Sequence, residues 1–439
     1  MIEPLETENF FRHQYGKLVA SLTKRVGIQF LDRIEDAAQS ALLKGLEKWS
    51  VERSKTNHEP NSSIPDNPSA WLFKVATNYL LDDLRQKSNR ERLLNENSQR
   101  FIENLENSNS VPKSGQFNDD LLDLLFKSCH PEVPIESQLV FALKLICGFS
   151  NKEIAFRLFI SEENAYKRFS RARKKLEEVN PSYHELSIVE LVNRLLAVNK
   201  VLYLLFTEGY LSTHHNQSIR KELCCEALRL CLLVAEFLSK QSGKVTDLNL
   251  LTNTSQTYAL IALMYFHLAR LTARQNHSGG LLLLQEQDRS LWDKTNIFSG
   301  FQWLEKSSIG NNFSRYHAEA GIAAEHCLAK TYAETRWKEI VEIYALLEKK
   351  SPSAIHRLNH AVAIAEWKGP MAALDFLSEY KPPNWSQSSF MWSAVLADLH
   401  KQNGNEEVAD QYQNQALDLA TNDQLREMLL RRLANSNKR

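Results

Sequence analysis

Helix-breaking residues are scarce along this chain, and that scarcity limits what the chain can fold into. Of its 439 residues only 14 are glycine and 12 are proline. The long stretches between them repeat leucine, alanine, glutamate, lysine and arginine with the period of an α-helix. A hydrophobic content of 43% and a charged content of 24% are typical of a globular protein with a buried core. The sequence therefore predicts an all-α fold.

Charge and cysteine usage narrow the class of protein further. Lysine plus arginine and aspartate plus glutamate balance at 53 each, so any surface for nucleic acid must be local. The six cysteines form no CxxC pair, which predicts reduced and mostly buried thiols. The N-terminal residues MIEPLETENFFRH lack the features of a signal peptide, and no run of 18 apolar residues occurs. We expect a cytoplasmic protein without a membrane segment.

Polar stretches broken by proline and glycine divide the chain. After a first helical pattern and a polar segment, a helix is predicted to begin at Asn67-Pro68, an N-cap followed by proline at the first helical position. A second polar stretch contains Pro112 and Gly115. The predicted parts are a helical bundle over residues 8–94, a linker over 95–118, a compact helical unit over 119–180 and a larger helical region over 182–439.

The segment NKEIAFRLFISEENAYKRFSRARKK, residues 151–175, predicts two short helices joined by a tight turn. Ser150 and Glu153 form a capping box at the start of the first helix, and Ser161 caps the second. The second helix carries an apolar stripe at helical spacing, made of Ala165, Phe169, Ala172 and Leu176. Such a pair is typical of a helix-turn-helix motif, whose second helix enters the major groove.

The second helix is strongly basic. Residues 164–175 hold six lysines and arginines and no acid, although the whole chain is neutral. The alternative to a DNA-binding surface is a solvated surface helix. Phe159 stands in the turn where many such motifs carry a glycine with positive φ, so the turn has another shape or Phe159 packs against the core. The candidate DNA contacts are Ser161, Glu162, Glu163, Asn164, Lys167, Arg168, Arg171 and Arg173.

Two helices upstream carry a second group of candidate residues. In RIEDAAQSALLKGLEKW, residues 33–49, the pattern buries Ile34 and its helical neighbours and predicts Glu35, Asp36 and Gln39 on the outside. In PSAWLFKVATNYLLDDLRQKSNR, residues 68–90, an aromatic, amides and cations share one face and suit unstacked bases and phosphates. The alternative is that the tryptophan belongs to the core and the cations are solvated. The candidates are Trp71, Lys74, Asn78, Asp82, Arg85, Lys87 and Arg90.

The motifs EDAAQ, PSAWLFKVATNYLLDDLR and FSNKEIAFRLFISEENAYKRFSRARKKL resemble, in this order, regions 2 and 4 of extracytoplasmic-function (ECF) sigma factors of bacterial RNA polymerase. The resemblance implies a region 2 helical bundle that binds the −10 element through the residues of the 68–90 helix. It implies a region 4 helix-turn-helix domain that binds the −35 element. Glu35, Asp36 and Gln39 would contact the clamp helices of the polymerase β′ subunit, and the polymerase β flap is a further implied partner.

The chain beyond residue 182 contains internal repeats. Aligning Arg336, Gly369 and Gly404 gives steps of 33 and 35 residues, near the 34 of the tetratricopeptide (TPR) repeat. The blocks LLFTEGY, QDRSLWD and LNHAVAIAEWKGPMAAL resemble a subset of ECF sigma factors with such a C-terminal extension. We expect a TPR-like regulatory domain with an intramolecular or protein partner. Within QDRSLWD we expect Trp292 in the core and a local ion pair between Asp288 and Arg289, near Asp293. The alternative is that these four residues bind a ligand or a partner.

Catalytic patterns are absent from the sequence. It has no phosphate-binding loop, no dinucleotide fingerprint and no nucleophile elbow. His356 and His360 have the i, i+4 spacing of a metal pair, but Arg357 between them adds positive charge, so we expect structural histidines. The predicted protein is not an enzyme and has no metal and no cofactor.

The sequence thus predicts a sigma factor that binds core RNA polymerase and promoter DNA. One alternative is a helix-turn-helix regulator with a TPR sensor or scaffold domain, and another is a TPR scaffold whose first half only mimics a sigma factor. Two features distinguish the sigma factor from the regulator. They are the helix with Glu35, Asp36 and Gln39 and the face from Trp71 to Arg85, neither of which such a regulator needs.

Overall fold

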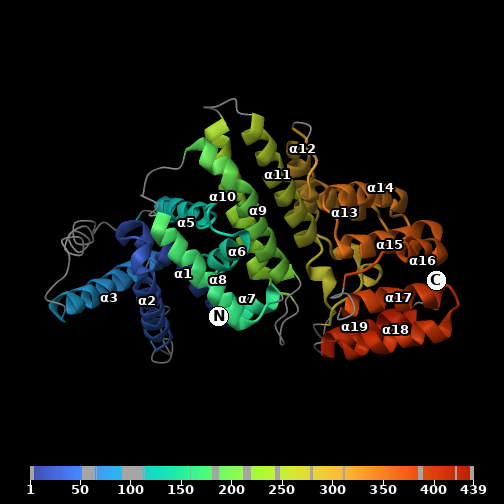
Figure 1. The fold of residues 1–439 in the computed structure, drawn as a ribbon, viewed down its shortest axis with the longest axis horizontal. Coiled ribbons are helices and arrows are strands. Elements are labelled where there is room, and N and C mark those ends of the chain that lie inside the picture. Colours follow the sequence, from blue (N-terminus) through green and yellow to red (C-terminus); the bar gives the residue numbers. More distant parts are fainter. Residues whose placement is uncertain are drawn as a thin grey trace, which may run out of the picture. The chain divides into compact units, whose positions relative to one another are not determined.

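The computed structural model describes residues 4–51, 65, 67–90, 112, 114–158, 160–179, 187–210, 219–242, 248–276, 280–309, 312–383, 389–420 and 423–435. Within these ranges every regular element is a helix, and one isolated bridge joins Gln275 and Leu281 (Figure 1). The predicted all-α class is therefore confirmed. The chain forms two compact units, residues 1–205 (unit 1) and residues 206–439 (unit 2).

Unit 1 begins with a bundle of three helices, α1 (Pro4–Val26), α2 (Leu31–Val51) and α3 (Pro68–Arg90). Gly27, with φ of 95°, turns the chain between the first two helices, where the sequence pattern ran on without a break. As predicted, α3 begins after an N-cap: the Asn67 side chain accepts the Ala70 N–H at 3.0 Å. The core of this bundle is apolar and fully buried, and includes Leu18, Leu22, Leu31, Ile34, Leu72 and Leu80.

Four shorter helices follow, α5 (Ser114–Ser128), α6 (Ile135–Leu145), α7 (Asn151–Arg157) and α8 (Glu162–Val179). The helix α5 starts inside the segment that the sequence assigned to the linker, residues 95–118, so the linker prediction was too long at this end. Phe141 of α6 stacks on Phe169 of α8 with 5.4 Å between ring centroids. This contact joins α8 to the core of the group.

The two helical groups of unit 1 pack against each other instead of forming separate domains. Asp120 of α5 accepts hydrogen bonds from Ser21 Oγ at 2.8 Å and from Lys24 Nζ at 2.6 Å, both on α1. A Cβ added to Gly16 of α1 would lie 2.3 Å from the carbonyl oxygen of Ile146, which follows α6. The absence of a side chain at Gly16 thus permits the backbones to approach closely.

The helix α9 (Ile188–Tyr210) begins in unit 1, and its last five residues belong to unit 2. Unit 2 continues with α10 (Lys221–Ser242), α11 (Leu248–Ala269), the 3-10 turns η3 (Thr272–Arg274), η4 (Leu284–Glu286) and η5 (Arg289–Leu291), and α12 (Lys294–Ser307). Trp292 is buried, as predicted. The expected ion pair between Asp288 and Arg289 is wrong: Asp288 caps η5 by accepting the Ser290 N–H, and Arg289 bonds to carbonyls at the end of α13.

The rest of unit 2 is a row of helical hairpins, each packed on the next (Figure 1). The turns of three successive hairpins contain Arg336, Gly369 and Gly404, the residues that the sequence aligned. Two of them need glycine, because φ is 95° at Gly369 and 78° at Gly404. The helices are α13 (Arg315–Leu328), α14 (Trp337–Lys350), α15 (Ala354–Lys368), α16 (Pro370–Ser378), α17 (Phe390–Gln402), α18 (Glu406–Asp418) and α19 (Asp423–Asn435).

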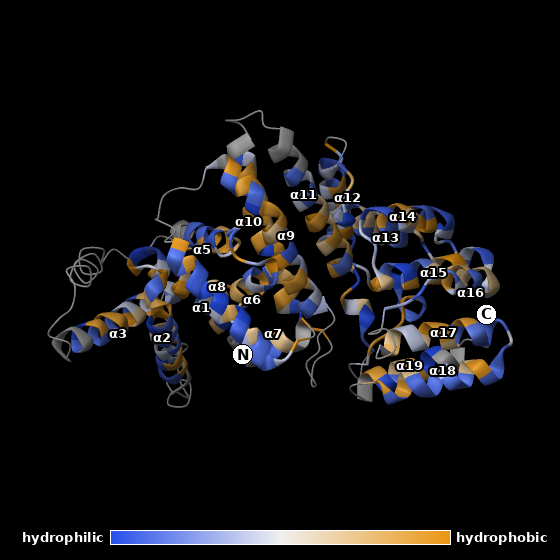
Figure 2. Ribbon diagram, in the orientation of Figure 1, coloured by the Kyte–Doolittle hydropathy of each residue, from blue (hydrophilic) through white to orange (hydrophobic). Residues whose placement is uncertain are grey.

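Hydropathy separates buried from solvated helices. Long hydrophobic stretches run along α9 and α10, whereas α18 is largely hydrophilic (Figure 2). Across the part of the chain that the structure describes, none of the helices has the length and apolar character needed to cross a bilayer. The six cysteines are free thiols, and Cys225 is the exposed one.

Candidate nucleic-acid interface

Local hydrogen bonds fix the two helices of the predicted motif. Ser150 and Glu153 form the expected capping box, with Ser150 N–H donating to Glu153 Oε2 at 2.8 Å and Glu153 N–H to Ser150 Oγ at 3.2 Å. Ser161 Oγ accepts the Asn164 N–H at 3.2 Å and caps α8. The predicted apolar stripe is buried, with Ala165, Phe169, Ala172 and Leu176 each exposing 4% or less. Phe159, whose place in the turn was in question, lies outside the described residues.

The opposite face of α8 is open to solvent. Its exposed candidates are Ser161, Glu162, Glu163, Asn164, Lys167 and Arg171, and Arg168 is half-buried. Lys167 forms an ion pair with Glu163 at 2.6 Å, one turn away. Both partners are largely exposed, so this pair is weak and can be exchanged for a phosphate contact. The face combines polar side chains at the helix start with cations farther along, as groove binding requires.

Arg173 does not belong to this open face, and its role as a phosphate contact stays a prediction. Its guanidinium binds Asp32 of α2 and donates to Glu177 at 2.8 Å. The hydrogen bond from Arg173 lowers the pKa of Asp32, and the same contact raises the pKa of Arg173. Position 173 follows the buried Ala172, and its side chain reaches Asp32 at the start of α2.

One exposed residue of α8 was missed by the sequence reading. Tyr166 exposes 58% of its surface, next to the exposed cations of this face. An aromatic ring immediately after the buried Ala165, and therefore off the apolar stripe, was the available signal. A tyrosine on a cationic face can contact sugar, phosphate or a base edge.

The predicted polymerase contacts on α2 divide into one buried and two exposed residues. Asp36 and Gln39 are exposed, as expected, but Glu35 exposes only 8%. Tyr15 of α1 donates its hydroxyl to Glu35 Oε1 at 2.8 Å. Burial raises the pKa of Glu35, although the nearby Lys144 acts in the opposite direction. The expectation that Glu35 points outward is wrong, because α1 packs on this side of α2 and its Tyr15 bonds to the carboxylate.

Glu35 instead lines an open groove of about 740 Å³ in unit 1. One wall of the groove is apolar and belongs to α2, with Leu43 exposing 61% and Leu46 exposing 43%. The other wall comes from the second helical group and includes Lys144 and Phe149. A partner helix lying in this groove would therefore touch both groups of unit 1.

The candidates on α3 are exposed apart from its tryptophan. Lys74, Asn78, Asp82 and Arg85 face solvent, and Asp82 and Arg85 form only a 3.9 Å ion pair. Trp71 is half-buried, with its ring centroid 5.4 Å from that of Trp49 and Lys48 Nζ 5.6 Å away. Lys87 and Arg90 lie on the same helix, but their side chains fall outside the described residues. The aromatic member of this face thus packs within unit 1.

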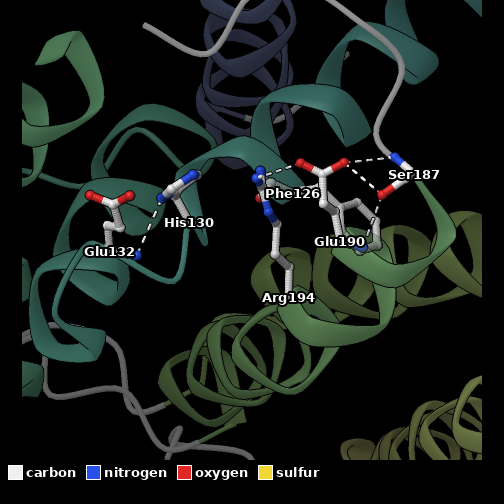
Figure 3. Close-up of polar contacts among 6 residues, drawn as sticks. All are labelled: Phe126, His130, Glu132, Ser187, Glu190 and Arg194. Atoms are coloured by element: carbon white, nitrogen blue, oxygen red, sulfur yellow. Dashed lines mark hydrogen bonds and ion pairs between the residues drawn. The ribbon is translucent and has the colours of Figure 1, made fainter. Parts of the chain in front are cut away.

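A buried arginine joins α9 to the second helical group (Figure 3). Arg194 is 3% exposed, donates Nη1 to the Phe126 carbonyl of α5 at 3.3 Å, and lies 3.7 Å from Glu190 Oε1. Glu190 also accepts the Ser187 N–H and hydroxyl at 2.8 Å, which caps α9. Burial, and then the charge of Arg194, lower the pKa of His130. The first half of α9 is therefore bonded to α5 of the second helical group.

The two histidines with metal-like spacing bind separate partners in unit 2. The Nδ1 atom of His356 lies 2.9 Å from the carbonyl oxygen of Ser351, and His360 Nδ1 lies 2.7 Å from Glu348 Oε1. Over the residues that the structure describes, no group of three histidine, cysteine or acidic side chains is arranged to hold a metal ion.

Two segments of the chain match protein families. Residues 124–176 match the family "Sigma-70, region 4", and residues 194–308 match a family of unknown function (DUF6596). Over 394 residues the chain is 30% identical to an uncharacterized protein of Rhizobium meliloti (strain 1021). The aligned residues cover 89% of this chain and 87% of that protein. No solved structure matches the chain. The first match runs from α5 to α8 and so contains the open basic face.

Proposed function

The chain belongs to the same family as this Rhizobium meliloti protein and carries a sigma-70 region 4 domain, and on this premise we propose that it is an RNA polymerase sigma factor of the ECF type. The region 4 domain gives it a DNA-binding role in transcription. One observation carries the proposal. The match to sigma-70 region 4 includes α8, and this helix buries its apolar stripe and exposes its cationic face. In this role the protein acts in the cytoplasm and without catalysis of its own.

Each part of unit 1 has a place in the proposed mechanism. The α7–α8 pair binds the −35 duplex through Lys167, Arg168 and Arg171, while α3 holds the opened −10 strand through Asn78 and Arg85. Unpairing costs a few kcal/mol per base, which contacts of the polymerase and of α3 offset. Asp36 and Gln39 on α2 contact the basic clamp helices of the β′ subunit, and the groove beside them receives apolar side chains.

Transcription from purified components tests the proposal. Full-length protein is added to core polymerase that lacks any sigma factor, and run-off transcripts are mapped on a library of promoter fragments. A sigma factor produces specific transcripts with core enzyme alone. A helix-turn-helix regulator with a TPR sensor gives none under these conditions and acts only when another sigma factor is present, so this outcome would replace the proposal.

We propose further that the C-terminal region, with its TPR-like hairpins, regulates the sigma module through α9. Support comes from Arg194, which lies within the DUF6596 match and bonds to α5 of the region 4 domain. A truncation at residue 180 would remove this hydrogen bond together with the tail, so a substitution is the cleaner test. Arg194→Gln should change promoter output, while Lys200→Gln, an exposed change on the same helix, should not. Equal output from both variants would contradict the regulatory role.

A further inference from the structure

Two hydrogen-bond donors, on Trp292 and Arg289, have no acceptor among the residues that the structure describes. Trp292 exposes 4% of its surface, and the guanidinium carbons of Arg270 and Arg289 lie 5.2 and 4.8 Å from its ring centroid. Trp292 Nε1 and Arg289 Nη2 are inaccessible and find no partner among the described residues. Within the same described ranges, the side chain of Arg270 bonds only through Nε, to Gln287 Oε1 at 3.4 Å. Buried donors without acceptors are rare, and a missing ion or water is one of their causes.

A third arginine adds to the positive charge. The Arg274 guanidinium carbon lies 3.7 Å from the Tyr210 ring centroid, and its Nη1 donates to the Tyr210 carbonyl. Arg289 Nη1 donates to the carbonyls of His326 at 2.5 Å and Ala329 at 2.7 Å. These carbonyls end α9 and α13, and Arg270 follows the end of α11. Since a helix C-terminus carries about half a negative charge, the three ends offset only part of the charge of three arginines.

Carboxylates do not supply the remainder. Within the described residues, no aspartate or glutamate forms an ion pair with Arg270, Arg274 or Arg289, although the more distant Glu334 acts on Arg289. Three other buried or half-buried arginines have such partners: Arg194 with Glu190, Arg357 with Glu348, and Arg432 with Asp398. A buried cation without a counter-charge is costly, so the contrast indicates that an anion completes this cluster.

Asp288 and Asp293, the acids nearest in sequence, are used elsewhere. Asp288 accepts the Ser290 N–H at 2.8 Å. Asp293 accepts the backbone N–H groups of Thr295 and Asn296 at 2.8 and 3.0 Å and so caps α12. Both carboxylates are exposed and satisfied by these caps. The motif QDRSLWD therefore directs its acids outward and its arginine and tryptophan inward.

Two buried histidines, His267 and His326, border the cluster. Burial, and then the charges of neighbouring arginines, hold the pKa of His267 well below its usual value and lower that of His326 to about 3. The Nδ1 atoms of both have no partner among the described residues. His326 also stands in the wall of a cavity of about 200 Å³, together with Tyr332, Trp337 and Tyr344. His326 is the member of the cluster that reaches this cavity, whose lining includes neither Arg270 nor Arg289 nor Trp292.

We propose that Arg270, Arg289 and Trp292 form a binding site for a small phosphate-bearing molecule. A phosphate oxygen accepts several N–H donors at once, and the planar forks of arginine match phosphate geometry. The phosphate satisfies the free donors of Trp292 and Arg289 and supplies the missing negative charge. Arg274 and the two histidines lie around this group, and the cavity at His326 receives the organic part. The site does not depend on the proposed function of unit 1.

Calorimetric titration of the full-length chain with sodium phosphate and sodium pyrophosphate tests the site, with sodium chloride at equal ionic strength as the reference. We expect saturable binding, and a rise in Tm that grows with phosphate concentration. Arg270→Gln should weaken binding about tenfold or more, since it removes hydrogen bonds to a charged group. The matched control is Arg336→Gln, which removes an arginine whose ion pair with Glu325 lies at the surface.

Each outcome decides the proposal. Heat and Tm changes equal to those in chloride, or unchanged affinity in Arg270→Gln, overturn it. Should Arg270→Gln fail to fold by circular dichroism, Trp292→Phe decides instead, because the smaller side chain keeps an aromatic ring and removes the indole N–H donor. This variant should bind phosphate severalfold more weakly. If it binds as tightly as the unaltered chain, the site is not an anion site.

Discussion

Helices α2 and α8 meet in unit 1 through Asp32 and Arg173, yet they bury their residues in different ways. The core side of α8 is a narrow stripe of four residues, and most of its remaining circumference is solvated. On α2 small residues widen the buried side: Ala37, Ala38 and Ala41 are buried, and α1 and α3 pack against this helix. Glu35 falls inside that wider side. The exposure of a charged residue therefore depends on the neighbouring helix as much as on its own position.

The largest effect is expected from the stripe of α8. Phe169→Ala removes the stack on Phe141 and leaves a cavity, so it should lower the free energy of unfolding by about 3–5 kcal/mol. Urea denaturation followed by circular dichroism measures this change. Tyr166→Ala, an exposed aromatic change three residues earlier, should cost less than about 0.5 kcal/mol. Similar losses of stability in both variants would mean that α8 is not anchored by its stripe.

The open face of α8 should decide DNA affinity. The double variant Arg168→Glu/Arg171→Glu should weaken binding to duplex DNA about tenfold or more, and the salt slope should fall by about one for each phosphate that the protein no longer neutralises. Fluorescence anisotropy at several salt concentrations measures both quantities. Lys338→Glu/Arg426→Glu changes the net charge equally on exposed residues of other helices. An equal decrease of affinity in this control would show that net charge, and not α8, binds DNA.

Local sequence patterns predicted the features that local contacts determine. The caps at Ser150 and Ser161, the start of α3 at Asn67 and the turns at Gly369 and Gly404 depend on hydrogen bonds or dihedral angles within a few residues. The buried stripe of α8 follows from the helical period alone. The fold class and these element boundaries could therefore be predicted from the sequence.

Contacts between residues far apart in the chain could not be predicted from the sequence. Arg173 and Asp32 are 141 residues apart, and nothing in either segment indicates the other. Glu35 is buried by Tyr15 and Lys144 from two other helices. Arg289 bonds to carbonyls at the end of α13, which are 37 and 40 residues away. It does not pair with the adjacent Asp288, because that carboxylate already caps η5. In each case a partner elsewhere in the chain changes what the local pattern predicts.

A smaller effect is expected from the ion pair that joins the two helices. Asp32→Asn releases Arg173, so duplex DNA affinity should rise roughly two- to fivefold through one more phosphate contact. Stability should fall by no more than about 1 kcal/mol, because Asp32 is largely exposed. Since the pKa of Asp32 is lowered in the folded protein, its stabilisation exists above the unfolded pKa and is lost as pH falls through the folded pKa.

Anisotropy and thermal melts between pH 3 and pH 7 test this pair, with Asp36→Asn as the control on the same helix. The control removes an exposed carboxylate, so it should leave DNA affinity and the pH profile unchanged. If Asp32→Asn binds DNA no more tightly than the unaltered chain, Arg173 does not reach phosphate even when it is released.

The smallest effect should come from Glu35 and should depend on pH. Burial raises the folded pKa of Glu35 above its ordinary value of 4.5, so the folded protein holds this proton more tightly than the unfolded chain. Stability is therefore lost as pH rises from the ordinary pKa through the folded one. Glu35→Gln keeps an acceptor for the Tyr15 hydroxyl and should match the unaltered chain in acid. It should exceed that stability at neutral pH, by less than about 1 kcal/mol. Thermal melts across this pH range measure the difference in stability. If the variant is less stable at neutral pH, Glu35 is ionised in the folded protein and held by Lys144. In that case α2 resembles α8, because both helices then carry their charge on a functional face.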